Sequence, residues 1–340
     1  MKGEKSKITM IGFDRAFETV MSFVKRTASE DVPLSKANGR ILYKDIFSDM
    51  DMPPFDKSAM DGYACKSSDL VKPLRIIETL PAGYKPKKSI GQGECSKIMT
   101  GAMVPQGADC VVMVEHTKEE KDFVHIVKQT GISNICYKGE DINQGDKVLH
   151  AGAQISPPVI AVLASVGCDP VPVAIRPVVG ILATGTELVE PSQSPSAVQI
   201  RNSNSYQLCA QIERAGCIPR YFGIAEDTPE HIDQMLKKAL AKSDIVLLSG
   251  GVSMGDFDFV PGILQKNDVD LKFEKVAIKP GKPTVFGIKD DKYFFGMPGN
   301  PVSTFILFEL LVRPFLFSLM GGQDNRMRLK VKMKETMKRK

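Results

Sequence analysis

Hydrophobic positions change their spacing along the chain, and the changes mark its parts. Phe13, Phe17, Val20 and Val24 recur at helical spacing and predict an amphipathic helix near the N-terminus. From about residue 51 to about residue 146, short apolar runs alternate with proline and glycine, which is typical of a small, mostly β domain. This domain is therefore predicted to be inserted into a discontinuous N-terminal helical domain, formed by residues 1–50 and 147–175.

After residue 176 the pattern alternates between short apolar strands and longer helices. Strands are predicted at residues 178–183, 218–224, 244–248, 271–278, 284–288 and 293–296, and helices at 204–215, 228–242 and from 302 onward. A further helix, predicted at 157–166, precedes this region and belongs to the N-terminal helical domain. Such alternation is typical of an α/β domain whose parallel or mixed sheet is flanked by helices. Residues 176–325 are assigned to this domain. A chain of 340 residues is too long for a single core, which agrees with a multidomain α/β protein.

The turn after the predicted strand 244–248 carries the densest candidate chemistry. It reads Ser-Gly-Gly-Val-Ser-Met-Gly-Asp-Phe-Asp over residues 249–258. Glycines at the carboxyl end of a parallel strand let the backbone approach a ligand. Backbone amides there suit a phosphate, and the two aspartates suit a divalent cation. A plain strand-to-helix turn with an aspartate near a helix N-terminus is the alternative.

Acidic residues follow three successive strands of this domain. Glu187 lies past the first strand, Asp227 past the second, and Asp256 and Asp258 past the third. Because the carboxyl ends of parallel strands meet at one edge, this pattern predicts a Mg²⁺ site beside a phosphate. Taken singly, Glu187 and Asp227 would be explained as helix caps.

Two further turns of the α/β domain suit anions. Lys279 and Lys282 lie in a Lys-Pro-Gly-Lys-Pro turn, where the prolines limit the loop's freedom and two ammonium groups could bind one small oxyanion. A solvated turn is the alternative. Residues 296–301, Gly-Met-Pro-Gly-Asn-Pro, precede the last helix and offer its N-terminus to an anion.

Composition narrows the class of protein. A hydrophobic content of 43% and a charged content of 25% are typical of a soluble globular protein, and a net charge of +5 does not require nucleic-acid binding. The seven cysteines contain no Cys-x-x-Cys, which favours a reducing compartment and disfavours a structural zinc site. The N-terminus lacks a signal-peptide core, and Glu309, Arg313 and Pro314 interrupt the apolar run 302–320. The predictions are a cytoplasmic location, no membrane and no nucleic acid.

The inserted domain contains two motifs that imply no reaction by themselves and could be ordinary turns. They are Pro-Pro-Phe-Asp-Lys-Ser-Ala-Met-Asp-Gly-Tyr at residues 53–63 and Thr-Gly-Ala-Met-Val-Pro-Gln-Gly-Ala-Asp at residues 100–109. Together with Gly-Glu-Asp-Ile, Ser-Gly-Gly-Val-Ser-Met-Gly, Lys-Pro-Gly-Lys-Pro and Pro-Gly-Asn-Pro-Val-Ser, they occur in the order seen in the MoeA family. From about Ile8 to about Gly322 the chain resembles molybdopterin molybdenumtransferases, including the E domain of gephyrin.

The resemblance implies a reaction and partners. Members insert molybdate into the dithiolene of adenylylated molybdopterin with the help of Mg²⁺, and they release AMP to give molybdenum cofactor. Molybdate and adenylylated molybdopterin would be substrates, and a molybdopterin adenylyltransferase would supply the latter. Members act as homodimers in which the inserted domain reaches toward the partner's site. Molybdate and tungstate are similar tetrahedral dianions, and the sequence does not choose between them.

The resemblance also implies roles for individual residues. Carried over, the acidic and Mg²⁺ set falls on Glu187, Asp227, Asp256 and Asp258, and the inserted-domain set on Asp61, Thr100 and Asp141. Lys279 and Lys282 would bind molybdate. The remaining substrate-binding residues would be Ser249, Gly250, Gly251, Ser253, Pro298 and Asn300.

Members usually continue into a C-terminal β domain, whose start is expected at residues 326–340. An arginine and a serine of that domain belong to the family's molybdate site. Two alternatives to the transferase follow: a molybdopterin-binding module that is inactive without that domain, or a nucleotide pyrophosphatase on the same fold, which resembles the competence-damage proteins. The Ala-Met-Asp-Gly-Tyr segment argues against the pyrophosphatase.

Overall fold

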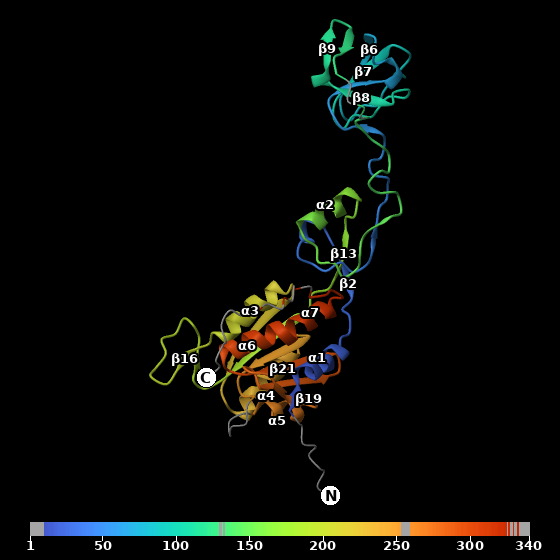
Figure 1. The fold of residues 1–340 in the computed structure, drawn as a ribbon. Coiled ribbons are helices and arrows are strands. Elements are labelled where there is room, and N and C mark those ends of the chain that lie inside the picture. Colours follow the sequence, from blue (N-terminus) through green and yellow to red (C-terminus); the bar gives the residue numbers. More distant parts are fainter. Residues whose placement is uncertain are drawn as a thin grey trace. The chain divides into compact units, whose positions relative to one another are not determined.

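The computed structural model describes residues 10–128, 131, 133–252, 259–324, 326, 329 and 332. The chain forms two compact units, each described here by itself (Figure 1). The first unit comprises Met1–Lys44, His150–Ala161 and Asp169–Lys340, and the second comprises Asp45–Leu149 and Val162–Cys168. These units divide the chain differently from the four predicted domains, so that finer division stays a prediction.

A seven-stranded mixed sheet forms the centre of the first unit. Its order is β1-β19-β20-β21-β18-β14-β17. The strands are β1 (Ile11–Gly12), β14 (Val178–Thr184), β17 (Ile218–Ala225), β18 (Ile245–Ser249), β19 (Asp270–Ala277), β20 (Pro283–Lys289) and β21 (Lys292–Met297). Pairing is parallel from β17 to β21 and antiparallel on both sides of β20. The carboxyl ends of β14, β17, β18, β19 and β21 therefore share one edge of the sheet.

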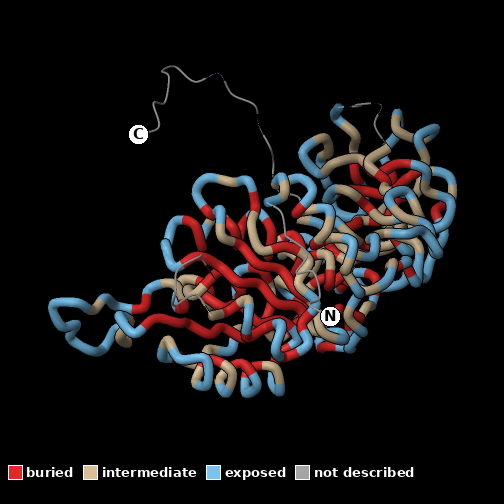
Figure 2. Tube along the Cα trace, turned by 90° about the horizontal axis from the view of Figure 1, so that it is seen from below, coloured by how far each residue is buried: buried red, intermediate tan, exposed pale blue. Residues whose placement is uncertain are grey.

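Helices cover both faces of this sheet, because its strands are apolar on both sides. Alternate residues of β14 and β18 enter two separate cores; Ile181 and Leu247 belong to one, and Leu182 and Leu248 to the other. The first core also takes side chains from α1 (Phe13–Ser22), α3 (Asn204–Arg214), α6 (Pro301–Leu307) and α7 (Arg313–Leu319). The second takes side chains from α4 (Pro229–Leu240) and α5 (Val260–Lys266). The central strands are accordingly buried along their length (Figure 2).

The helix that runs through residues 301–319 is a core helix. It contains α6, a wider π-helical turn (Phe308–Val312) and α7. The segment is long and apolar enough to cross a membrane, but 67% of its apolar window is buried inside the structure. Phe308, Leu311 and Phe315 pack in the first core. Burial against the sheet accounts for its hydrophobicity, as the sequence predicted.

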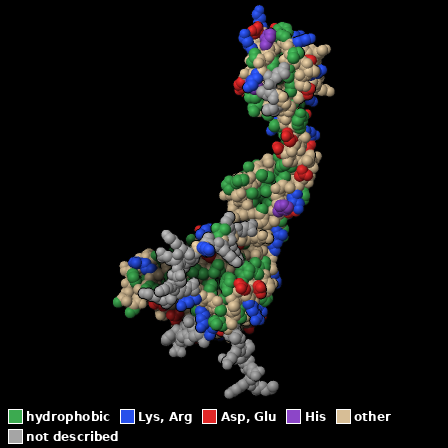
Figure 3. Space-filling model, in the orientation of Figure 1, with side chains coloured by type: hydrophobic (Ala, Val, Ile, Leu, Met, Phe, Trp, Pro, Cys, Tyr) green, Lys and Arg blue, Asp and Glu red, His purple; other side chains and the backbone are tan. Residues whose placement is uncertain are grey.

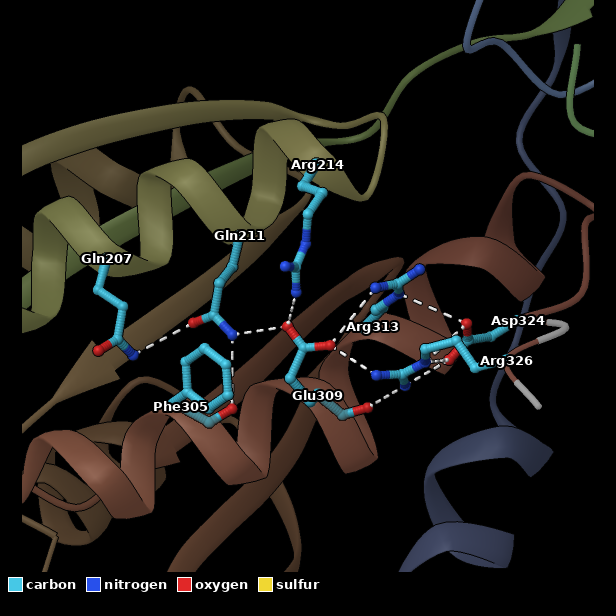
Figure 4. A network of polar contacts seen from close by, with 8 residues as sticks. All are labelled: Gln207, Gln211, Arg214, Phe305, Glu309, Arg313, Asp324 and Arg326. Atoms are coloured by element: carbon cyan, nitrogen blue, oxygen red, sulfur yellow. Dashed lines mark hydrogen bonds and ion pairs between the residues drawn. The ribbon is translucent and has the colours of Figure 1, made fainter. Parts of the chain in front are cut away.

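A buried carboxylate ties this helix to α3 (Figure 4). Glu309 is only 8% exposed. Its Oε1 accepts hydrogen bonds from Gln211 at 2.8 Å and from Arg214 at 2.5 Å. Its Oε2 accepts from Arg326 at 2.6 Å and lies 3.4 Å from Arg313 Nη1. One side chain thus links α3, α7 and the segment that follows α7.

Smaller elements complete the first unit. The predicted N-terminal helix α1 belongs to this unit, whereas α2 (Pro157–Ser165) is divided between the two units after Ala161. Strands β2 (Ser29–Val32) and β13 (Val171–Ala174) form an antiparallel pair, and a short helix at Leu34–Lys36 follows β2 in the chain. Between β14 and α3, the chain forms an arm with the short strands β15 (Leu188–Val189) and β16 (Ile200–Arg201), labelled at its tip in Figure 1. Residues 190–199 lack an apolar period, and the sequence did not predict the arm.

The second unit is mostly β, as predicted for the inserted segment. Its six-stranded sheet has the order β8-β5-β7-β6-β10-β9, with apolar clusters on both faces. The strands are β5 (Gly62–Cys65), β6 (Leu74–Leu80), β7 (Glu94–Ile98), β8 (Cys110–Met113), β9 (Thr117–Glu120) and β10 (Phe123–Ile126). The unit also contains two short antiparallel strand pairs, β3 (Ile46–Phe47) with β12 (Lys147–Leu149) and β4 (Lys57–Ser58) with β11 (Ile135–Cys136). Single helical turns lie at Ser67–Asp69 and Val114–His116. Basic and acidic side chains are interspersed on the face shown in Figure 3.

Candidate functional site

A cavity of about 500 Å³ lies at the carboxyl edge of the seven-stranded sheet. The ends of β14, β17 and β18, the arm and the starts of α3 and α6 supply its walls. This is the edge at which open α/β sheets bind ligands. Its lining residues are Thr184, Gly185, Glu187, Leu188, Ile200, Arg201, Asn202, Ser203, Asn204, Asp227, Ser249, Gly250, Gly251, Gly299, Asn300 and Pro301.

The Ser249-Gly250-Gly251 turn forms one wall and needs its glycines. Gly250 has φ +98° and Gly251 φ +62°. A Cβ at Gly250 would lie 2.4 Å from the carbonyl oxygen of Thr184, and one at Gly251 would lie 2.8 Å from Thr184 Oγ1. Thr184 is 3% exposed, and among the described residues nothing forms a hydrogen bond with its hydroxyl. The predicted residues Ser249, Gly250 and Gly251 thus meet at the cavity beside an unpaired buried hydroxyl.

Two of the predicted carboxylates line the same cavity. Glu187 and Asp227 come from the loops after β14 and β17. Asp227 Oδ2 accepts a hydrogen bond from the amide of Thr186 at 3.0 Å, which ties the two loops together. The carboxylate of Glu187 lies over Gly185, where a Cβ would be 2.7 Å from Oε2. The structure therefore brings together two acids that are 40 residues apart in sequence.

Three predicted site residues lie outside the described residues: the substrate-binding Ser253 and the acidic Asp256 and Asp258. Within the described part of the chain, no group of three or more His, Cys, Asp or Glu residues could hold a metal ion. Two carboxylates facing a substrate cavity nevertheless suit Mg²⁺, which proteins usually bind through one or two carboxylates together with substrate phosphates and water.

The sequence predicted that the N-terminus of α6 is free to bind an anion, but in the structure a side chain of the preceding turn caps it. Asn300 Oδ1 accepts hydrogen bonds from the amides of Val302 at 3.0 Å and Ser303 at 3.1 Å. Pro298 is held through its carbonyl, which accepts from Thr304 Oγ1 at 2.6 Å. Two of the backbone amides that an anion would use already donate to Asn300, so the start of α6 does not offer these amides to an anion. Asn300 still lines the cavity.

The predicted lysine pair lies at the same sheet edge, outside the lining of the cavity. Lys279 and Lys282 belong to the turn between β19 and β20, and both are exposed. Gly281 has φ +112°, and a Cβ there would lie 3.0 Å from Leu307, so the turn packs on α6. The two ammonium groups are thus presented to solvent beside the helix whose start lines the cavity.

Four polar cavity residues escaped the sequence analysis: Arg201, Asn202, Ser203 and Asn204. Asn202 is buried; its amide donates to Ser205 and Tyr221, and its Oδ1 accepts from the amide of Ser205. The Arg201 guanidinium is anchored through Nε to the carbonyls of Pro191 and Gln193, both at 3.2 Å. The available signal was the polar run Arg-Asn-Ser-Asn at residues 201–204, directly before a helix.

The second unit brings two predicted residues into contact. Asp61 precedes β5 and Thr100 follows β7, at the end where these strands pair. The amide and the hydroxyl of Thr100 both donate to Asp61 Oδ1 at 2.6 Å. These hydrogen bonds, the hydroxyl's first, hold the pKa of Asp61 below its usual range. Asp141 is exposed, and its amide donates to the carbonyl of Met52.

Comparisons with known proteins agree with this architecture. Residues 11–167 match the family model described as the MoeA N-terminal region (domain I and II), and residues 180–318 match the probable molybdopterin binding domain. A molybdopterin molybdenumtransferase of Bacillus subtilis is 40% identical over 323 residues, which cover 91% of this chain and 75% of that protein.

The chain belongs to the molybdopterin molybdenumtransferase family. A relative of the same name from Staphylococcus epidermidis is 37% identical and covers 93% of this chain, which spans 78% of that protein. A solved structure of the molybdopterin biosynthesis MoeA protein from Pyrococcus horikoshii has a TM-score of 0.79 at 33% identity, covering 93% of this chain and 81% of that one. The chain is therefore a transferase of molybdenum cofactor biosynthesis with the multidomain fold of its family.

Proposed function

We propose that this molybdenumtransferase inserts molybdate into adenylylated molybdopterin in a Mg²⁺-dependent reaction that releases AMP. The observation that carries the proposal is the 500 Å³ cavity in which a glycine turn and the carboxylates of Glu187 and Asp227 meet. A phosphate needs close backbone approach, and the glycines permit it. A cation beside that phosphate needs acidic ligands, and the two loops provide them.

Each group of the chain has a part in this proposal. Gly250 and Gly251 would admit the phosphate group against the end of β18, and the Thr184 hydroxyl would hydrogen-bond to the substrate. Glu187 and Asp227 would hold Mg²⁺. When bound, the ion would offset the negative charge of the phosphate and of the leaving AMP. Lys279 and Lys282 would attract the molybdate dianion at the same edge.

The direct test is an assay of the chain with adenylylated molybdopterin and molybdate, with and without Mg²⁺. The expected products are AMP and a molybdenum cofactor that activates a cofactor-free molybdoenzyme. Binding of molybdopterin with no AMP release would instead indicate a binding module. AMP release from other dinucleotides without molybdate would indicate a pyrophosphatase, and either result contradicts the proposal.

The biological setting is part of the proposal. An adenylyl transfer to molybdopterin must supply the substrate, so a molybdopterin adenylyltransferase would be the donor. We place the chain in the cytoplasm, where the reducing environment suits its seven cysteines. We also propose a homodimer, in which Asp61 and Thr100 of one subunit complete the cavity of the other.

Mixed dimers test this shared site. Asp61→Asn and Asp227→Asn are each expected to inactivate the homodimer, because each removes one charge from the proposed composite site. Mixing the two inactive variants should restore up to about a quarter of the activity, since half of the dimers are mixed and each of these has one intact site. If exchange of subunits is demonstrated and activity stays absent, each site is built from a single chain.

The lysine turn has its own test. Lys279→Ala and Lys282→Ala are each expected to weaken molybdate binding about tenfold, because each removes one charge-assisted contact from an exposed site. Calorimetric titration would measure this, and sulfate should compete as a dianion of similar size. Lys238→Ala on α4, which removes an exposed lysine elsewhere on this unit, is the control. An unchanged molybdate affinity in either variant would identify that lysine as a solvated turn residue.

A further inference from the structure

Three asparagine side chains line the cavity, and they differ in how their hydrogen bonds are used. Asn202 uses its Nδ2 toward Ser205 and Tyr221 and its Oδ1 toward the amide of Ser205. Asn300 uses its Oδ1 to cap α6. The acceptors of these two residues are therefore occupied by the protein itself.

Asn204, the first residue of α3, is arranged otherwise. Its Nδ2 donates to Ser249 Oγ at 2.9 Å and to the carbonyl of Gly299 at 2.8 Å. Because a carbonyl can only accept, the amino group of Asn204 must face Gly299, and this fixes the orientation of the amide. Both N–H groups are used, which leaves Oδ1 as the available atom. Within the described part of the chain, that oxygen is buried and has no partner.

An unpaired buried acceptor is uncommon in folded proteins, and a ligand donor is one way to satisfy it. Phosphate oxygens cannot satisfy it, because an ionised phosphate only accepts. The heterocycles of the proposed substrate can, because the pterin ring and the adenine ring each carry an amino group. The glycine turn suits the phosphate, and Asn204 on the neighbouring wall suits a ring.

We propose that Asn204 Oδ1 accepts a hydrogen bond from the amino group of one of the substrate's heterocycles, while Nδ2 holds the Ser249 and Gly299 turns in place. This inference rests on the proposed function and adds to it a residue that recognises the substrate's ring. It also predicts an orientation, with one heterocycle against the start of α3 and the phosphate at Gly250 and Gly251.

The experiment measures dissociation constants for molybdopterin and for AMP separately, each with the full chain. Asn204→Leu has a similar size and removes both the acceptor and the donors. Asn204→Asp keeps acceptor oxygens and loses both N–H groups. Gln207→Ala, on the next turn of the same helix and outside the cavity lining, is the matched control. Thermal unfolding followed by circular dichroism checks that each variant is folded.

The decisive quantity is the ratio of the two dissociation constants. A distortion of the cavity, or repulsion between a new carboxylate and the phosphate group, would weaken both ligands and leave this ratio unchanged. Asn204→Leu is expected to shift this ratio about tenfold. The ligand that weakens more identifies the ring that Asn204 contacts. Asn204→Asp should shift the ratio less and in the same direction, and Gln207→Ala should leave it unchanged.

Two results would overturn the inference. An unchanged ratio in Asn204→Leu would mean that Asn204 only holds the turns, and an equal shift in Asn204→Asp would mean that the acceptor is not what matters. If the unmodified chain binds neither molybdopterin nor AMP, the proposed function itself fails. If it binds them and the variants behave alike, the assignment of Asn204 fails alone.

Discussion

Asp227→Asn is expected to slow Mg²⁺-dependent AMP release by about 100-fold or more. Replacing groups that only orient a metal ligand typically costs about 10- to 100-fold, and a residue that holds the ion should cost at least as much. The substitution is well matched to the structure. Asn keeps an oxygen that can accept the hydrogen bond from Thr186, now 3.0 Å from Oδ2, so the loop is retained while the charge is lost.

The neighbouring acid provides the control for this experiment. Glu226 is one residue away, its side chain is 74% exposed, and it does not line the cavity. Glu226→Gln should therefore change the rate by less than about twofold, since exposed charges interact weakly. The Mg²⁺ concentration for half-maximal rate should rise in Asp227→Asn alone. A normal rate in Asp227→Asn would reduce Asp227 to a residue that joins two loops.

The sequence predicted the elements of the α/β unit well, because their apolar periods are strong. The strand predicted at 178–183 is observed at Val178–Thr184, and the helix predicted at 204–215 at Asn204–Arg214. Thr228 caps α4 directly before Pro229, and its hydroxyl accepts a hydrogen bond from the amide of His231. Helix and strand bounds and helix caps depend mainly on residues that are close in sequence, so they can be predicted from the sequence.

The order of strands could not be obtained in the same way. β20 lies between β19 and β21 and runs against both, although its apolar pattern resembles that of its parallel neighbours. Both faces of these strands are buried, so an apolar run does not report direction. The arm at residues 188–201 was missed for a related reason, because it has no apolar period.

The candidate site was predicted in part. Glu187, Asp227 and the Ser249–Gly251 turn were found because each follows a strand whose carboxyl end lies at one edge. Asn204 was missed because its contacts with Ser249 and Gly299 span 45 and 95 residues. The cap made by Asn300 was missed because Pro-Gly-Asn-Pro allows either a bound anion or a self-capped helix. Only the geometry of the side chain decides between them.

Glu309 carries the largest expected effect on stability. Burial alone would raise the pKa of its carboxyl group, but the hydrogen bond from Gln211 and the charges of Arg214, Arg313 and Arg326 outweigh burial and hold the pKa below its usual range. The wider turn of the π-helix carries this residue, and Figure 4 shows the carboxylate between the guanidinium groups. The ionised form is therefore part of the folded structure.

Glu309→Gln is expected to lower the free energy of unfolding of this unit by about 3 kcal/mol, because it removes the charge of a buried carboxylate that pairs with the largely buried Arg313 and with the more exposed Arg214 and Arg326. This loss of stability is near the lower end of the range for broken buried ion pairs, because Asp324 still pairs with Arg313 and Arg326 in the variant. Urea unfolding followed by circular dichroism measures it. Asp291→Asn breaks the exposed ion pair with Lys25 in the same unit, and it should leave the free energy of unfolding almost unchanged.

The same carboxylate predicts how stability depends on pH. A glutamate whose pKa is lower in the folded state contributes stability that is fully present above the unfolded value, about 4.3. That contribution falls as the pH drops below this value, and it is lost below the folded-state pKa, where the carboxyl group is protonated in both states. Unfolding free energies of the unmodified chain and Glu309→Gln should therefore differ most at neutral pH and converge below about pH 4. A difference that stays constant from neutral pH to acid would show that lost packing, and not lost charge, destabilises the variant.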